Sequence, residues 1–184
     1  VCATLATLSA MAFSSTVKSK LVGDVKISCK ESAWKIDTKI VSKGDIEEIT
    51  IEMTATEPTT PTPLKVEFMT PQLDAHHLWH TNRSNRTILP PDWSGKYSSA
   101  LAQTVPLYSF INSNNRNRLT IATSEAKRRV DARIGLREEG AVLYGALSFF
   151  TEAEAPISHY KTTILLDKRD IFWADAIREG VVWI

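Results

Sequence analysis

The sequence is poor in cysteine and glycine, and each shortage excludes a class of protein. Only 2 of its 184 residues are cysteines, which excludes a small domain held together by several disulfides. The 7 glycines are scattered, and they form neither a nucleotide-binding glycine motif nor the GxSxG motif of a serine hydrolase. No apolar run approaches the ~20 residues that a membrane-spanning helix needs, so we expect no membrane span. A formal net charge of +1 gives no overall field that attracts nucleic acid, and we expect no nucleic-acid partner.

Residues 1–16 differ from the rest of the chain because they are uncharged and rich in small side chains. The triplet Ala10–Ala12 ("AMA") is similar to the cleavage site of a signal peptide. Two interpretations stay open, the tail of a signal peptide and an ordinary first strand. The first implies that Cys2 is absent from the mature protein, and it is the basis on which we expect a secreted or periplasmic location. The glycosylation sequons at Asn82 and Asn85 do not decide this, because three-residue patterns arise by chance.

From residue 24 onward, apolar and polar residues alternate with a period of two, which predicts β-strands. Residues 25–29 and 34–40 each place apolar side chains on one face, and we expect Cys29 to be a buried free thiol. The turn residues 42–45 predict a hairpin with the next strand. The proline-rich segment 56–63 predicts an exposed connection, because proline cannot donate to a central strand ladder.

Residues 70–103 show no steady period and are rich in proline, asparagine and serine. We expect a long functional loop there, with a short piece of helix near residues 96–103. Strand patterns return afterwards, and about nine strands at this spacing predict an all-β, two-sheet antiparallel β-sandwich over residues 17–169.

Residues 170–184 predict a C-terminal helix with Asp170 as its N-cap, while Asp167 pairs with Lys168 or Arg169. Its apolar side chains recur at helical spacing: Trp173, Ile177, Val181 and Ile184. The pattern ends on apolar residues without a stop signal. We therefore expect a linker helix whose apolar side contacts a further domain that is missing from this chain.

The segment "DAHHLWH" carries Asp74, His76, His77 and His80, the densest group of metal-ligand residue types in the chain. The spacing of His76 and His80 matches a zinc-protease helix, but the glutamate that would activate water is replaced by His77. We expect a hydrogen-bonded loop and no metal or other cofactor. A metal-dependent jelly-roll enzyme built on Asp74, His76 and His80 stays open as an alternative.

The tryptophans indicate two different environments. Trp34 and Trp173 lie on apolar faces and are expected in a core or an interface. Trp79 and Trp93 lie in the polar segment, where an indole ring either packs against protein or stacks on a sugar ring. A carbohydrate-binding β-sandwich module that uses Trp79 and Trp93 is therefore another alternative. No acidic pair in the sequence forms a convincing catalytic set.

Three stretches between Pro71 and Ile184 together resemble the N-terminal β-supersandwich domain of glycoside hydrolase family 36, the α-galactosidase family. They are "PQLDAHHLWH", the run from "VPLYSFINSNNRNRLTIATSE" through "DARIGLREEG", and "TTILLDKRDIFWADAIREGVVWI". Members of this family continue through a short helix into a (β/α)8 barrel that carries two catalytic aspartates of a retaining mechanism. The resemblance implies that this chain is a non-catalytic, inactive part of such an enzyme and that its partner is the barrel.

The resemblance also implies an auxiliary site for a carbohydrate substrate. A loop of the sandwich approaches the sugar pocket, in the same subunit or in a neighbouring one, which leaves open a homo-oligomer. Asp74 and Trp79 lie at the matching position, with Trp79 as a pocket wall and Asp74 as an acceptor for sugar hydroxyls. The double histidine and the missing proline after Trp79 depart from the family pattern.

Overall fold

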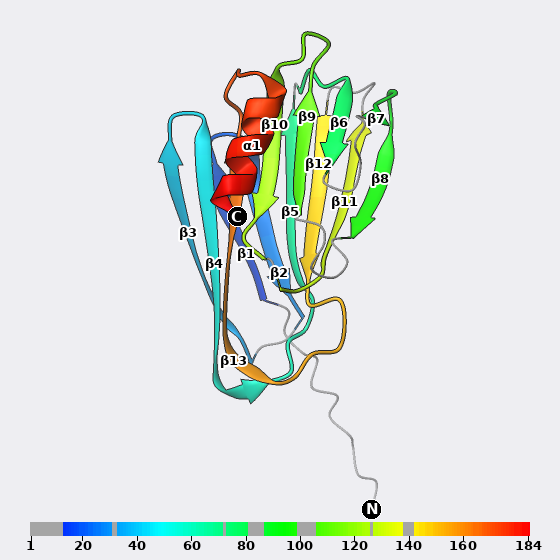
Figure 1. The fold of residues 1–184 in the computed structure, drawn as a ribbon. Helices are drawn as coiled ribbons and strands as arrows, with labels where there is room; N and C mark the ends of the chain where they lie inside the picture. Colours follow the sequence, from blue (N-terminus) through cyan, green and yellow to red (C-terminus); the bar gives the residue numbers. More distant parts are fainter. Residues whose placement is uncertain are drawn as a thin grey trace, which may run out of the picture.

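The chain folds as two antiparallel β-sheets packed face to face, with a helix on the outside of one of them (Figure 1). A computed structural model describes residues 13–30, 33–71, 73–80, 87–98, 106–125, 127–137 and 142–184. Within these ranges the chain forms thirteen strands and one helix. The predicted all-β sandwich with a C-terminal helix is therefore confirmed.

Sheet A, in spatial order, contains β1 (Phe13–Ser19), β2 (Gly23–Cys29), β5 (Leu64–Pro71), β12 (Val142–Phe149), β11 (Val130–Arg137) and β8 (Ser94–Ser98). Sheet B contains β3 (Lys35–Lys43), β4 (Ile46–Thr59), β13 (Ile157–Asp167), β10 (Asn117–Thr123), β9 (Leu107–Ile111), β6 (His77–His80) and β7 (Thr87–Ile88). Helix α1 (Trp173–Trp183) follows β13 and lies against β9 and β10.

The core lies between the two sheets and follows the predicted alternation. Val25, Ile27 and Cys29 point inward from β2, and the Cys29 thiol is free and buried. The β3–β4 hairpin is also confirmed, with Gly44 at φ 61° in its turn, a backbone conformation that favours glycine. Trp34 is buried in the same core, as the sequence predicts.

The proline-rich segment does not end the strand where the sequence predicts. Strand β4 continues through Pro58 to Thr59, although it lies between two other strands. The reason is that β3 pairs with β4 only as far as Thr54, opposite Lys35. Beyond Thr54 no strand of the described residues pairs with this edge of β4, so the missing N–H of Pro58 removes no described ladder bond there.

Residues 70–103 are not one long loop. They contribute β6 and β7 to sheet B and β8 to sheet A, so this segment crosses from one sheet to the other. The predicted helical piece is wrong for residues 96–98, which belong to β8, and residues 99–105 lie outside the described ranges. The strands are short, at 4, 2 and 5 residues, too short for alternation to be read from the sequence.

Helix α1 begins later than the sequence predicts. Its N-cap is Phe172, which makes no side-chain capping bond, so the prediction of Asp170 as the cap is wrong. Asp170 instead accepts a hydrogen bond from Arg116 Nε at 2.8 Å. This contact lowers the pKa of the Asp170 carboxyl below its usual value.

The segment at the start of the chain is described from Phe13, where β1 begins, so residues 13–16 belong to a strand. Cys2, Asn82, Asn85, Glu138 and Glu139 lie outside the described residues. Within the described part of the chain, no helix has the length and apolar character that a bilayer crossing requires.

Candidate functional site

The candidate site is a groove on the outer face of sheet B, between helix α1 and the hairpin end of β3 and β4. Its volume is about 310 Å³. Both polar and apolar residues line it: Val41, Lys43, Ile46, Glu48, Leu165, Asp167, Arg169, Glu179, Gly180 and Trp183.

An apolar cluster between α1 and sheet B forms the inner side of the groove. Leu107, Ala122 and Leu165 point outward from the sheet, and Ile177 of α1 covers them. Gly180 allows the close approach, because a Cβ atom there would lie 2.8 Å from Leu107 Cδ1. The helix is therefore packed against the sandwich over a buried apolar contact.

Three of the four predicted apolar residues, Trp173, Ile177 and Ile184, contribute to this cluster, and Trp183 joins them. These side chains contact sheet B of the same sandwich, and the contact of the helix with a further domain stays a prediction. The fourth predicted residue, Val181, is exposed, as are Phe172 and Val182, of which Val182 is 82% exposed.

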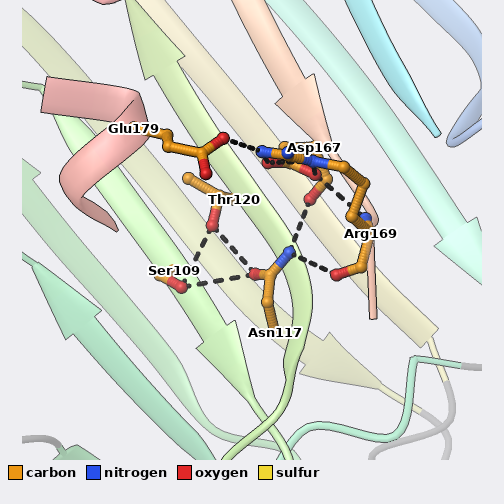
Figure 2. A network of polar contacts seen from close by, with 6 residues as sticks. All are labelled: Ser109, Asn117, Thr120, Asp167, Arg169 and Glu179. Carbon is orange, nitrogen blue, oxygen red and sulfur yellow. Dashed lines mark hydrogen bonds and ion pairs between the residues drawn. The ribbon is translucent and has the colours of Figure 1, made fainter. Parts of the chain in front are cut away.

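A buried polar network holds the segment that leads from β13 into α1 (Figure 2). At its centre, Asn117 Nδ2 donates to the carbonyl oxygens of Asp167 and Arg169 at 3.0 and 3.1 Å. The Asn117 Oδ1 atom accepts from the hydroxyls of Thr120 and Ser109 at 2.9 and 3.4 Å. Asn117 is fully buried, and its amide takes part in holding both carbonyls in place; the Arg169 carbonyl also accepts from the Ile171 backbone N–H at 3.0 Å. Loss of a buried hydrogen-bond partner costs about 1–3 kcal/mol for a group left without any other.

One guanidinium links the end of β13 to the helix. Arg169 Nη2 lies 2.6 Å from Asp167 Oδ2 and 2.6 Å from Glu179 Oε2 (Figure 2). The pairing of Asp167 with Arg169 agrees with the sequence prediction. The hydrogen bonds to Asp167 raise the pKa of Arg169, burial acts in the opposite direction, and the contact with Glu179 raises the pKa further.

A second link ties the far end of α1 to the sheet. Trp183 Nε1 donates to Glu48 Oε1 of β4 at 2.9 Å. The carboxylates of Asp167, Glu179 and Glu48 in the groove are thus each engaged by a donor within the chain. The arrangement fixes the helix on the sheet.

None of the three predicted sugar-binding residues lines this groove. Asp74 is exposed, and its Oδ1 lies 3.1 Å from Nε2 of His76. Trp79 is half-buried on β6 and packs against the apolar cluster under α1. Trp93 is half-buried too, but it packs against the core between the sheets, with its ring centroid 6.2 Å from that of Tyr97. Trp79 and Trp93 therefore belong to different clusters.

The histidines do not form a metal centre in the part of the chain that the structure describes, where no group of three or more His, Cys, Asp or Glu side chains could hold an ion. His80 is buried, with its ring centroid 4.5 Å from that of Tyr97. His159 lies far along the sequence and contacts Glu52 at 2.8 Å. The metal-dependent alternative thus finds no ligand set here.

Sequence reasoning missed Asn117, Glu179 and Glu48. Asn117 follows a stretch of turn residues and looks like one more of them. The two carbonyl groups that it binds lie about fifty residues away, so no local sequence pattern indicates the contact. A signal was available for Glu179, since it and Trp183 are four residues apart and share one face of the helix.

The fold is similar to parts of two solved structures, while no protein-family model and no curated protein matches the sequence. An α-N-acetylgalactosaminidase, NagBb from Bifidobacterium bifidum, superposes with a TM-score of 0.51 and 10% sequence identity. The match covers 95% of this chain and 30% of that chain. The protein Slr1438 from Synechocystis sp. PCC 6803 has a TM-score of 0.46 and 9% identity, covering 84% of this chain and 65% of that one. The chain thus spans less than a third of the enzyme, and the likeness at this identity is one of fold.

Proposed function

We propose that this chain is the non-catalytic N-terminal β-sandwich of an α-galactosidase-like glycoside hydrolase, where it supports the catalytic barrel and helps to shape the sugar pocket. The observation that carries the proposal is a two-sheet sandwich with a helix fixed on sheet B, together with a fold match to part of an α-N-acetylgalactosaminidase. The family resemblance of residues 71–184 points in the same direction.

In this proposal the barrel contacts the exposed side of α1. The two links from Arg169 and Trp183 hold the helix in one orientation, so that Val181 and Val182 face outward with Phe172 beside the first turn. Covering large apolar side chains stabilises an interface by about 1.5–3 kcal/mol for each one that is fully buried. These three residues therefore provide a contact for a rigid partner domain.

The sugar pocket in this proposal receives side chains from the segment around β6. Exposed Asp74 would accept hydrogen bonds from sugar hydroxyls, and the half-buried indole of Trp79 would present a ring edge or face to the substrate. Such residues position a substrate without taking part in bond cleavage, so their loss should mainly raise KM.

The test compares the 184-residue chain with the protein encoded by the complete gene that contains it. Both are assayed on p-nitrophenyl α-galactoside and p-nitrophenyl α-N-acetylgalactosaminide. We expect hydrolysis by the complete protein only, and we expect Trp79→Ala in that protein to raise KM more than it lowers kcat, with Lys39→Ala as the matched surface control. A gene without a barrel-length continuation, or hydrolysis by the 184-residue chain itself, would refute the proposal.

A second candidate function is an independent carbohydrate-binding module, and the observation that favours it is the partial exposure of both Trp79 and Trp93. Calorimetric titration of the 184-residue chain with galactosides distinguishes the two functions. Saturable binding that is lost in Trp93→Ala would support the module, whereas absence of binding to any glycan on an array would exclude it.

The proposal also includes a secreted or periplasmic location and assembly into a homo-oligomer. Cell fractionation with an antibody against the chain should find the protein in the secreted or periplasmic fraction. Light scattering of the complete protein should show whether a neighbouring subunit is available to contribute Asp74 and Trp79 to a shared pocket.

A further inference from the structure

The outer face of sheet A carries two adjoining hollows that are unrelated to the groove under α1. One has a volume of about 580 Å³ and the other of about 470 Å³, and Arg133 of β11 and Tyr144 of β12 line both. Lys96 borders the first hollow, and Arg137 and Glu67 border the second. Strands β5, β8, β11 and β12 form their floor.

Basic side chains oppose each other directly in this face. The register of β8 and β11 pairs Lys96 with Arg133, and both side chains are exposed. Like charges opposite each other on neighbouring strands destabilise a sheet, because their Cβ atoms are only about 4.5–5.5 Å apart. A chain of net charge +1 has no general excess of basic residues that would force this pairing.

The nearby acids do not neutralise the pair. On the other side of Arg133 the register continues to Ala146 and then to Glu67, so Glu67 lies two strands away, roughly 10 Å. Glu67 is engaged by Lys65 at 2.6 Å, and Asp131 is engaged by Arg129 at 2.7 Å. Among the described residues, no carboxylate lies within ion-pair distance of Lys96, Arg133 or Arg137.

A third basic group is held in place by an aromatic ring. The Arg137 guanidinium lies 4.2 Å from the centroid of the Tyr144 ring, in the geometry of a cation–π contact. The ring lies close across Gly135, where a Cβ atom would be 2.4 Å from Tyr144 Oη. Arg137 is four residues from Arg133 on the same side of β11, so the Cα atoms of the two residues stand roughly 13 Å apart along the strand.

From these observations we propose that the outer face of sheet A binds a polysaccharide that contains uronic acid residues. One sugar carboxylate would lie between Lys96 and Arg133, where it removes the repulsion of the like-charge pair. A second would reach Arg137, and arginine recognises a carboxylate through two parallel hydrogen bonds. Hydroxyls of the intervening sugars would bond to the carboxylates of Glu67 and Asp131 and to Ser148.

The same face is poorly suited to nucleic acid. Glu67 and Asp131 at the rim of the second hollow would repel a dense row of phosphates. Single-stranded nucleic acid also needs open aromatic faces for base stacking, whereas the Tyr144 ring lies between Gly135 and Arg137. A widely spaced polycarboxylate fits the charge pattern better than a polyphosphate does.

The experiment is affinity electrophoresis of the 184-residue chain in gels that contain polygalacturonate, with neutral galactomannan and single-stranded DNA as parallel probes. The test variant is Lys96→Gln/Arg133→Gln, and the matched control is Lys39→Gln/Lys161→Gln, which removes the same charge from exposed positions of sheet B. We expect the test variant to bind polygalacturonate about tenfold more weakly or worse, because it loses charge-assisted contacts, and the control to bind as the original chain does.

Thermal unfolding of the same proteins separates a binding role from a structural one. We expect the test variant to keep or raise its Tm, since the substitution removes a repulsion. No retardation by polygalacturonate at low salt, equal loss in the control variant, or equal retardation by single-stranded DNA would each overturn the proposal. The proposal does not depend on the glycosidase function, so it stands or fails independently of the activity assays.

Discussion

At the scale of single residues, buried polar side chains join distant segments of the chain through hydrogen bonds. Glu47 of β4 is completely buried, yet three donors satisfy its carboxylate. The Ser19 hydroxyl, the Lys20 backbone N–H and the Ser42 hydroxyl lie at 2.5, 3.0 and 2.9 Å. Glu47 thereby ties the turn between β1 and β2 in sheet A to the β3–β4 hairpin in sheet B.

The environment of Glu47 predicts a pH dependence of stability. Burial alone would raise the pKa of this carboxyl, but the hydrogen bonds from Ser19, Lys20 and Ser42 outweigh burial and lower the pKa below its usual 4.5. The unfolded chain therefore binds the proton more readily than the folded chain does. The stabilisation by Glu47 is complete above pH 4.5 and is lost as the pH falls through the lower folded-state pKa.

We expect Glu47→Gln to lower the free energy of unfolding at pH 7 by about 1.5–3 kcal/mol, since it replaces charge-assisted hydrogen bonds with neutral ones. The variant should also lose less stability than the original chain between pH 5 and the acid limit. Urea unfolding at a series of pH values measures both effects, with exposed Glu57→Gln as the control. Parallel pH curves for the original chain and Glu47→Gln would contradict the prediction.

At the scale of elements, helix α1 depends on a small residue at its contact with sheet B. A side chain at Gly180 would meet Leu107, which is fully buried and has little room to move. We expect Gly180→Val to destabilise the chain by about 1–3 kcal/mol through overpacking, although valine is the better helix former.

A double-mutant cycle with Leu107→Ala tests the cause. Leu107→Ala removes the methyl group that the new side chain would meet, so the cost of Gly180→Val should be smaller in that background. Chemical unfolding of the four proteins gives the coupling free energy. Strict additivity would show that the helix does not pack on Leu107 in this way.

The strands also show which parts of the fold can be predicted from the alternation of apolar and polar residues. Alternation correctly located β2 and the β3–β4 hairpin, because one face of each strand is buried in the core and the pattern is local. It failed for β6 to β8, which are short, and for Pro58, whose tolerance depends on where the neighbouring strand starts.

The candidate site was less predictable than the fold. The pairing of Asp167 with Arg169 was visible because the two residues are close in sequence. The Asn117 network and the Trp183–Glu48 bond join segments that are far apart in the sequence. Asp170 was assigned a capping role because its partner in the structure, Arg116, is also far away in the sequence. The placement of Trp79 and Trp93 in separate clusters likewise follows from strand order, which no local pattern specifies.

At the scale of the whole molecule, the two outer faces of the sandwich differ in kind. Helix α1 covers part of sheet B (Figure 1) and shields Leu107, Ala122 and Leu165. The outer face of sheet A instead carries two hollows bordered by the charged side chains of Lys96, Arg133 and Arg137. In our two proposals, one face contacts a partner domain and the other binds a charged ligand.

Removal of residues 172–184 should convert the first face into an exposed apolar patch. We expect the shortened chain to keep its β-sheet circular dichroism, to bind the dye ANS strongly, and to lose about 2–5 kcal/mol of unfolding free energy with the helix contact. Val182→Ser, which changes an exposed position of α1, serves as the control and should leave dye binding unchanged. Unaltered dye binding by the shortened chain would show that α1 does not protect the sheet.

The two links of α1 have a geometric consequence for rotation about the helix axis. Arg169 holds Glu179 from the end of β13, and Glu48 holds Trp183 from β4, so the helix is gripped at two points on neighbouring strands. A single attachment would allow the cylinder to roll on the smooth aliphatic surface beneath it. Two attachments prevent this rotation, so Val181 and Val182 keep pointing away from the sheet.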